Sequence, residues 1–133
     1  MVLFAPEAPF LYCRLEGSPT EEILEPLLAA CNRAVSSSRG WFFNDWELFD
    51  RYTSRGRLAL TTWALRNRQK IAASHVLVGS KLVAMGVEVA NLALGGIYRT
   101  HTERARFHAE LQRTAKELDL KLPPLFALQR GSL

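Results

Sequence analysis

The sequence predicts an α/β domain with about four strands in a mostly parallel or mixed sheet and crossover helices packed against it. Short apolar or alternating segments recur along the 133 residues, and each precedes a segment with helix-start residues and helical apolar spacing. The composition, 48% hydrophobic and 23% charged, is ordinary for a globular chain, which at this length folds without disulfides or a metal. We expect one domain over residues 1–119 and an extended C-terminal tail over residues 120–133.

The first strand is predicted over residues 10–16, where apolar and polar side chains alternate as in a half-buried strand. Gly17 ends it, and residues 18–21 (Ser-Pro-Thr-Glu) have the pattern of a capping box with proline at the first helical position. The first helix should then run to about Val35, with a kink or a loosened turn at Pro26.

A second strand is predicted over residues 41–43, because the run Trp-Phe-Phe suits a strand that is buried on both faces. Residues 46–53 are predicted to form a turn or a short helical piece. A second helix should begin near Thr53 or Ser54. Its core-facing side chains are predicted to be Leu58, Thr62 and Leu65.

A third strand is predicted over residues 75–79, and Ser80 can cap a helix over residues 81–94 that the glycines at 95 and 96 end. The helix should turn Val83, Val87, Ala90 and Leu94 inward. The apolar segment 76–97 raises the question of a membrane span, but it contains Lys81 and Glu88, and a charge at a helix centre costs about 2.5–3.5 kcal/mol. We therefore expect a buried strand followed by a core helix, and no integral membrane segment.

A last short strand is predicted over residues 97–100. Thr102 should cap a final helix that has Glu103 in its first turn. The inner face of this helix is predicted to consist of Phe107, Leu111, Thr114 and Leu118. Strands and helices that alternate in this way favour a largely parallel sheet.

The two cysteines, Cys13 and Cys31, do not make a disulfide framework in a chain of this length. Both fall at core positions, so we expect small buried side chains with free thiols in a reducing compartment, and a redox pair is the alternative. Residues 1–9 contain Glu7 and two prolines and lack the basic start of a signal peptide. These features predict a cytoplasmic protein.

The net charge of +4 and the isoelectric point of about 9.4 give a mild positive bias, which favours an anionic partner. Nucleic acid is not expected, because the aromatic residues are not interleaved with the basic ones as in a base-stacking surface.

No catalytic centre is recognisable in the sequence. The histidines, which show no metal-binding spacing, are His75, His101 and His108. Asp45, Glu47 and Asp50 follow the second strand, where open parallel sheets bind ligands, so an acid/base or metal role is an alternative to turn capping and solvation. No histidine or second acidic cluster completes such a site. We predict a protein that is not an enzyme and has no metal and no cofactor.

Basic residues gather in the middle third of the chain, at Arg51, Arg55, Arg57, Arg66, Arg68, Lys70 and Lys81. Three of them lie near the start of the second helix, where free backbone N–H groups favour anions. The cluster is either a solvated face or a site for an anion or an acidic partner. The candidate binding or switch surface consists of Asp50, Thr53, Ser54, Arg55, Arg57 and Lys81.

The order of elements resembles that of the STAS family, the bacterial anti-sigma-factor antagonists, and of its looser SEC14-like relatives, over most of the chain. The segments that carry the resemblance are residues 15–17, 41–45, 53–56 and 75–80, with the late strand and final helix. Antagonists of this family have an Asp-Ser-Ser-Gly motif at the start of the second helix, and a partner kinase phosphorylates its second serine. Here residues 53–56 are Thr-Ser-Arg-Gly, so Arg55 stands at the acceptor position and only Ser54 or Thr53 could take its place.

The resemblance implies a non-catalytic regulatory or scaffolding module for signalling in bacteria. We expect it to bind a protein partner, such as a regulator, a kinase or a scaffold, through the N-terminal ends of the second and third helices. The alternative is a module that binds an anionic small molecule or lipid headgroup at the N-terminus of the second helix. A homo-oligomer is compatible with both interpretations.

Overall fold

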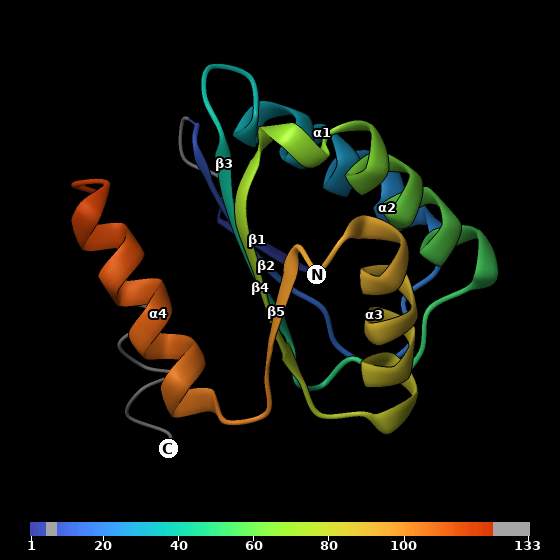
Figure 1. The fold of residues 1–133 in the computed structure, drawn as a ribbon. Helices are drawn as coiled ribbons and strands as arrows, with labels where there is room; N and C mark the ends of the chain where they lie inside the picture. Colours follow the sequence, from blue (N-terminus) through green and yellow to red (C-terminus); the bar gives the residue numbers. More distant parts are fainter. Residues whose placement is uncertain (5–7, 124–133) are drawn as a thin grey trace. The chain divides into compact units, whose positions relative to one another are not determined.

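The structure, a computed structural model, describes residues 1–4 and 8–123 and has an α/β fold (Figure 1). The chain divides into two compact units, residues 1–102 and residues 103–133. The first unit contains a five-stranded sheet and the helices α1, α2 and α3, and the second contains α4. The predicted boundary after residue 119 stays a prediction, and most of the predicted tail, residues 124–133, lies outside the described residues.

The sheet is mixed, and its strands lie side by side in sequence order. The strands are β1 (Val2–Phe4), β2 (Phe10–Arg14), β3 (Gly40–Trp46), β4 (Ile71–Val78) and β5 (Tyr98–His101). β1 runs antiparallel to β2, and all the other neighbours are parallel. The α/β class is therefore confirmed, whereas β1 is an additional strand that the sequence analysis missed because three residues are too short to show a period.

Three helices connect the parallel strands: α1 (Leu24–Ala34), α2 (Ser54–Arg66) and α3 (Lys81–Leu94). Each connection moves one strand further in the same direction across the sheet. Because such crossovers are almost always right-handed, all three helices must lie on the same face of the sheet, as Figure 1 shows. Short 3₁₀ turns precede α1 and follow α2.

The core lies between this face and the three helices. On β2, Leu11 and Cys13 belong to the core cluster with Leu27 of α1 and Val83 of α3, while Phe10 and Tyr12 alternate onto the other face. Cys13 and Cys31 are buried and unbridged, which confirms the prediction of free thiols. Burial raises the pKa of each thiol to about 12, so neither forms the thiolate that redox exchange requires.

The prediction for the start of the first helix is wrong. A 3₁₀ turn spans Glu21–Ile23, and α1 begins only at Leu24. Thr20 is the N-cap residue of the 3₁₀ turn, and its side chain makes no capping hydrogen bond. Pro26 consequently lies in the first turn of α1, where its missing N–H would have had no intrahelical partner. The expected kink is therefore not needed.

Two predictions for the middle of the chain are also wrong. β3 extends past the predicted segment 41–43 to Trp46, so Asn44 and Asp45 lie within the strand. On α2, the predicted core residues Leu58 and Leu65 are exposed, at 66% and 47%. The helix instead packs the core with Leu60, Trp63 and Ala64. Apolar side chains occur on both sides of α2, so their spacing could not show which side is buried. The buried side is set by the contact of the Trp63 ring with Phe42, whose ring centroids are 5.7 Å apart.

The prediction for α3 is correct in its bounds and only half correct in its burial. Ser80 accepts a hydrogen bond from the N–H of Val83, and Gly95 ends the helix in the left-handed conformation with a φ of 73°. Val83, Val87 and Leu94 are buried and Ala90 packs against the core, as expected. The opposite side of the helix is not buried, although a core helix was predicted. Its exposed apolar side chains are Leu82, Met85, Val89 and Leu92.

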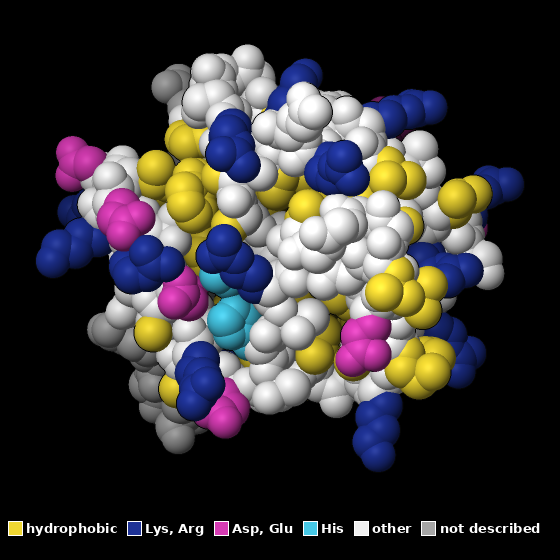
Figure 2. Space-filling view, in the orientation of Figure 1, with side chains coloured by type: hydrophobic (Ala, Val, Ile, Leu, Met, Phe, Trp, Pro, Cys, Tyr) yellow, Lys and Arg dark blue, Asp and Glu magenta, His cyan; other side chains and the backbone are white. Residues whose placement is uncertain are grey.

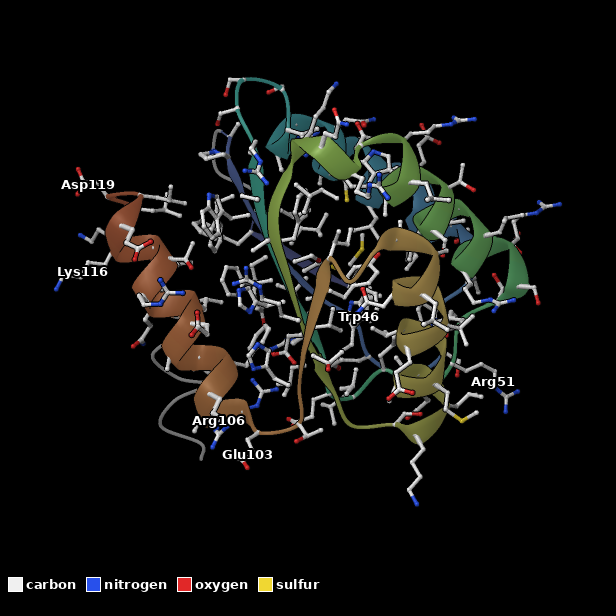
Figure 3. The ribbon with its side chains drawn as sticks, in the orientation of Figure 1. Trp46, Arg51, Glu103, Arg106, Lys116 and Asp119 are labelled. Atoms are coloured by element: carbon white, nitrogen blue, oxygen red, sulfur yellow. The ribbon has the colours of Figure 1, made fainter. Side chains whose placement is uncertain are left out.

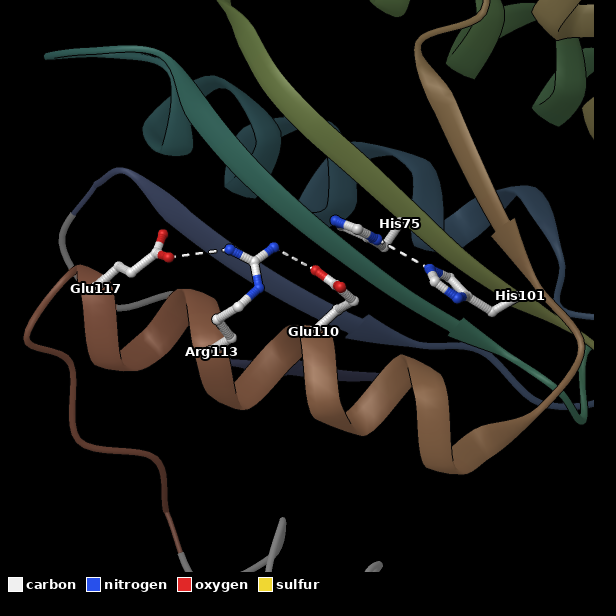
Figure 4. Close-up of polar contacts among 5 residues, drawn as sticks. All are labelled: His75, His101, Glu110, Arg113 and Glu117. Atoms are coloured by element: carbon white, nitrogen blue, oxygen red, sulfur yellow. Dashed lines mark hydrogen bonds and ion pairs between the residues drawn. The ribbon is translucent and has the colours of Figure 1, made fainter.

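The second unit contains α4 (Arg104–Glu117), which begins after Glu103 without a side-chain cap, so the predicted cap at Thr102 is wrong. Phe107, Leu111 and Thr114 are buried, as predicted for the inner face. On the exposed side, Arg113 lies between Glu110 and Glu117 and forms ion pairs with both (Figure 4).

Candidate functional site

The candidate site lies at the edge of the sheet where the parallel strands end and where α2 and α3 begin. Three loops meet there. The N–H of Gly17 donates to the carbonyl of Leu48 at 2.7 Å, and the N–H of Asp50 donates to the carbonyl of Gly17 at 2.8 Å. The Ser80 hydroxyl donates to the carbonyl of Asp50 at 3.5 Å. The predicted residues Asp50 and Lys81 are thus brought to the same edge.

Gly79 is required for this meeting of loops. A Cβ atom at position 79 would lie 2.3 Å from the carbonyl oxygen of Glu47, closer than any real contact. The loop that leads into α2 therefore passes directly over the backbone that leads into α3. A side chain at position 79 would separate the two helix starts.

The start of α2 contains the segment that carried the family resemblance. Thr53 is the N-cap, and its hydroxyl accepts a hydrogen bond from the N–H of Gly56 at 2.9 Å. Ser54 is the first helical residue and is exposed. The Thr53 hydroxyl is thus engaged in capping, and Ser54 presents its hydroxyl at the surface.

The basic residues at this edge differ in their pairing. Arg55 forms an ion pair with Glu21 at 3.4 Å, although its side chain is 79% exposed, so the pair contributes little to stability. Arg57 and Lys81 are also exposed, and neither forms an ion pair within the described residues. Arg51 extends away from the body of the first unit (Figure 3). α2 contains no acidic residue at all.

A groove of about 240 Å³ runs between α2 and α3, beside these helix starts. Arg57, Leu58 and Thr61 of α2 form one wall. The other wall comes from α3 and consists of Gly86, Val89, Ala90 and Ala93. The space exists because the α3 residues that face α2 have small side chains or none. Among the described residues that line it, Arg57 alone is charged.

Apolar side chains surround this groove on the outer surface. Leu58, Met85 and Val89 are exposed at 66%, 63% and 57%. Leu82 at 54% and Leu92 at 86% extend the same side of α3. Figure 2 shows several exposed hydrophobic side chains on the part of the molecule where α3 lies in Figure 1, with an acidic side chain among them and Lys and Arg at the margins. We call Leu58, Leu82, Met85, Val89 and Leu92 the apolar face.

Tyr52 lies beside Gly86, one of the residues that line the groove. A Cβ atom at position 86 would lie 1.2 Å from the Tyr52 hydroxyl oxygen, so glycine at this position makes room for the ring. A smaller cavity of about 30 Å³ lies beside it, and its lining includes Tyr52, Trp46 and Tyr98. Partial burial raises the pKa of Tyr52, and the positive charge of Arg57 opposes the shift.

A second group of polar side chains lies on the other face of the sheet. The Tyr12 hydroxyl donates to the Asp45 carboxylate at 3.0 Å, and both side chains are buried. On the neighbouring strands, Nδ1 of His75 and Nε2 of His101 are 2.9 Å apart (Figure 4). The His75 ring also stacks on Phe43, with centroids 4.7 Å apart. This buried arrangement of rings and hydrogen bonds holds adjacent strands in register.

The structure separates the carboxylates that the sequence placed together. Asp45 lies within β3 and pairs with Tyr12, Glu47 lies in the turn that follows, and Asp50 is exposed. Over residues 1–4 and 8–123, no group of three or more His, Cys, Asp or Glu side chains could hold a metal ion. At the edge where α2 and α3 begin, the described residues form neither a paired acid and base nor a nucleophile beside a base.

The sequence analysis missed two features of these surfaces. The histidine pair follows from the parallel register of β4 and β5, in which Leu77 lies opposite His101. His75 is two residues before Leu77 on β4, so its side chain lies on the same face of the sheet and reaches His101. The signal for the apolar face was that α3 carries apolar residues on more than one side, which the sequence analysis interpreted as full burial of the helix. α3 packs against α2 and one face of the sheet, so its outer side stays exposed.

No protein-family model, curated protein or solved structure matches the chain. Within the described residues, no helix is long and apolar enough to cross a membrane.

Proposed function

We propose that this chain is a non-catalytic regulatory or scaffolding module that binds a protein partner through the N-terminal ends of α2 and α3 and the apolar face beside them. The observation that carries the proposal is the apolar face itself, five large apolar side chains of which each is 54–86% exposed. Contiguous exposed apolar surface with a polar margin is typical of interaction sites, because soluble proteins otherwise bury it.

The helix starts add the residues that would orient the partner. Arg57 lines the groove, and Ser54 and Lys81 are the first residues of α2 and α3. The loops before these helices are held together by the close approach of Gly79 to Glu47 and by the hydrogen bond from Ser80 to Asp50. A rigid scaffold of this kind keeps the surface pre-organised, which lowers the cost of ordering it on binding. Membership in the STAS family, with its bacterial signalling role, is part of the same proposal and is supported by the element order.

The alternative is an anionic small molecule or lipid headgroup at the N-terminus of α2. Arg57 supports it, because this arginine has no ion pair within the described residues. Two contacts weaken it: Thr53 already satisfies the N–H of Gly56, and Arg55 is engaged by Glu21. The protein partner is therefore the better supported of the two.

The test compares proteins retained from a host lysate by the wild-type chain and by variants of the surface. Met85→Glu with Val89→Glu places carboxylates on the apolar face, and Arg55→Ala with Arg57→Ala removes charge at the start of α2. Ala109→Glu, on the exposed side of α4, is the matched control. We expect a partner that the control retains and the Met85/Val89 variant loses, with affinity at least about tenfold lower, since interface anchors exceed 1 kcal/mol.

All variants should melt within a few degrees of the wild type, because exposed substitutions change stability little. Retention of the same proteins by all variants would count against the proposed surface. A thermal shift with inorganic phosphate or a soluble phospholipid headgroup, abolished by Arg57→Ala, would favour the alternative.

A further inference from the structure

The groove between α2 and α3 has the dimensions of a helix contact. The exposed row from Leu82 to Leu92 on α3 spans ten residues, which is about 15 Å or three helical turns. Gly86, Ala90 and Ala93 leave the groove open to side chains that enter from outside. Its volume of about 240 Å³ accommodates a few apolar side chains.

The chemistry of the groove walls favours a helix over an extended strand. Both walls are helices, whose backbone N–H and C=O groups are already paired within α2 and α3. An extended peptide would lose water from its own backbone groups and find no partners there, whereas a helix satisfies them internally. An occupant of this groove is therefore helical, with apolar side chains spaced three to four residues apart.

The charge of the groove selects an acidic occupant. Arg57 is the one charged residue in the lining as far as the structure describes the chain, and α2 supplies no carboxylate. The acidic residue of α3, Glu88, lies two positions from both Gly86 and Ala90, about 200° around the helix at 100° per residue, and so points away from the groove. Lys81 lies five positions before Gly86, about 140° around the helix from it, and so also points away from the groove.

The same charges disfavour a second copy of this chain. Two copies joined groove to groove would bring their Arg57 side chains near each other, and no described residue of the groove lining supplies a carboxylate to compensate them. Like charges that face each other across an interface oppose association. An acidic partner has the opposite effect.

We propose that the groove between α2 and α3 binds an acidic amphipathic helix of the partner protein, whose apolar side chains insert between Leu58 and Val89 and whose carboxylate pairs with Arg57. This assignment rests on the proposed function, because it names the chemistry of the partner segment. It also predicts that salt weakens binding, since the ion pair is at the surface.

The test is a selection of displayed random peptides, each long enough for about four helical turns, on the immobilised wild-type chain. Enriched peptides should carry net negative charge and apolar residues at helical spacing. A synthetic copy of the most enriched peptide should bind at least about tenfold more weakly to Arg57→Glu and to Val89→Glu. Arg66→Glu is the matched control, because it lies nine residues from Arg57, half a turn around α2, and outside the groove lining.

Enrichment of basic or neutral peptides, no enrichment, or binding that Arg57→Glu leaves unchanged would overturn the acidic helix. So would a dimer in light scattering that Val89→Glu dissolves, or binding of the chain to anionic phospholipid vesicles that requires Arg57. Retention of a host protein that needs Val89 but not Arg57 would keep the proposed function and reject this assignment. If acidic peptides bind through the groove but no host protein needs the apolar face, the groove chemistry is kept and the proposed function is rejected.

Discussion

At the scale of single residues, Gly86 and Tyr52 decide how closely α2 and α3 approach. A Cβ atom at position 86 would overlap the Tyr52 hydroxyl, so we expect Gly86→Ala to destabilise the fold by about 1–3 kcal/mol, as overpacking does. Helix propensity alone predicts the opposite sign, a gain of up to about 1 kcal/mol. Chemical denaturation of the variant measures which effect is larger.

The matched control repeats the substitution where the ring is gone. In a Tyr52→Ala background, Gly86→Ala should be neutral or stabilising, and the double-mutant cycle then reports the contact itself. If Gly86→Ala alone is stabilising, or if it lowers the free energy of unfolding equally in both backgrounds, the Tyr52 ring does not occupy the space beside Gly86.

At the scale of elements, α2 and α3 have side-chain caps, whereas α1 and α4 begin without one. Ser80 caps α3 and Thr53 caps α2, whereas Thr20 makes no capping hydrogen bond. Ser80→Ala and Thr53→Ala should each lower the free energy of unfolding by about 0.5–2 kcal/mol. Thr20→Ala is the control and should change it by less than about 0.5 kcal/mol. Urea titrations followed by circular dichroism give the comparison, and a loss at Thr20 equal to that at Ser80 would contradict the assignment of caps.

At the scale of the whole molecule, three buried groups make stability depend on alkaline pH. Burial raises the pKa of Cys13 and Cys31 from 9.0 to about 12 and that of Tyr98 from 10.0 to about 12. The folded chain keeps these protons where the unfolded chain releases them. Stability should therefore be fully present below pH of about 9 and fall as the pH rises towards 12.

Melting temperatures between pH of about 8 and 10.5 measure this dependence. Cys31→Ala changes the absolute stability because a buried side chain is lost. The informative quantity is the slope of melting temperature against pH, which should be shallower in this variant because one titrating group is gone. A wild-type chain whose melting temperature stays constant over this range would show that these groups titrate normally in the folded state.

Much of the architecture could be predicted from the sequence because its signals are local. Ser80 before an apolar run and Gly95 after it set the bounds of α3 correctly, and the alternation around Cys13 placed that side chain in the core. Capping, glycine and periodicity act within a few residues, so one segment contains all the information. β1 was missed because its three residues depend on β2 for their hydrogen bonds.

The candidate site was predicted only in part. Asp50, Thr53, Arg57 and Lys81 were placed at helix starts, and the structure brings these starts to one edge of the sheet. The sequence could not show that Arg55 pairs with Glu21 or that Asp45 pairs with Tyr12, since each contact joins residues more than thirty positions apart. Such pairs depend on register and helix orientation.

The sequence by itself determined the alternation of strands and helices, the ends of α3 and the free cysteines, because these depend on local propensity and composition. Only the tertiary structure decided which side of α2 faces the core and that the outer side of α3 stays exposed. Both helices carry apolar side chains on more than one side, and a single sheet face can bury only one of them. Packing of Trp63 on Phe42 and of Tyr52 on Gly86 fixed that choice and left the apolar face exposed.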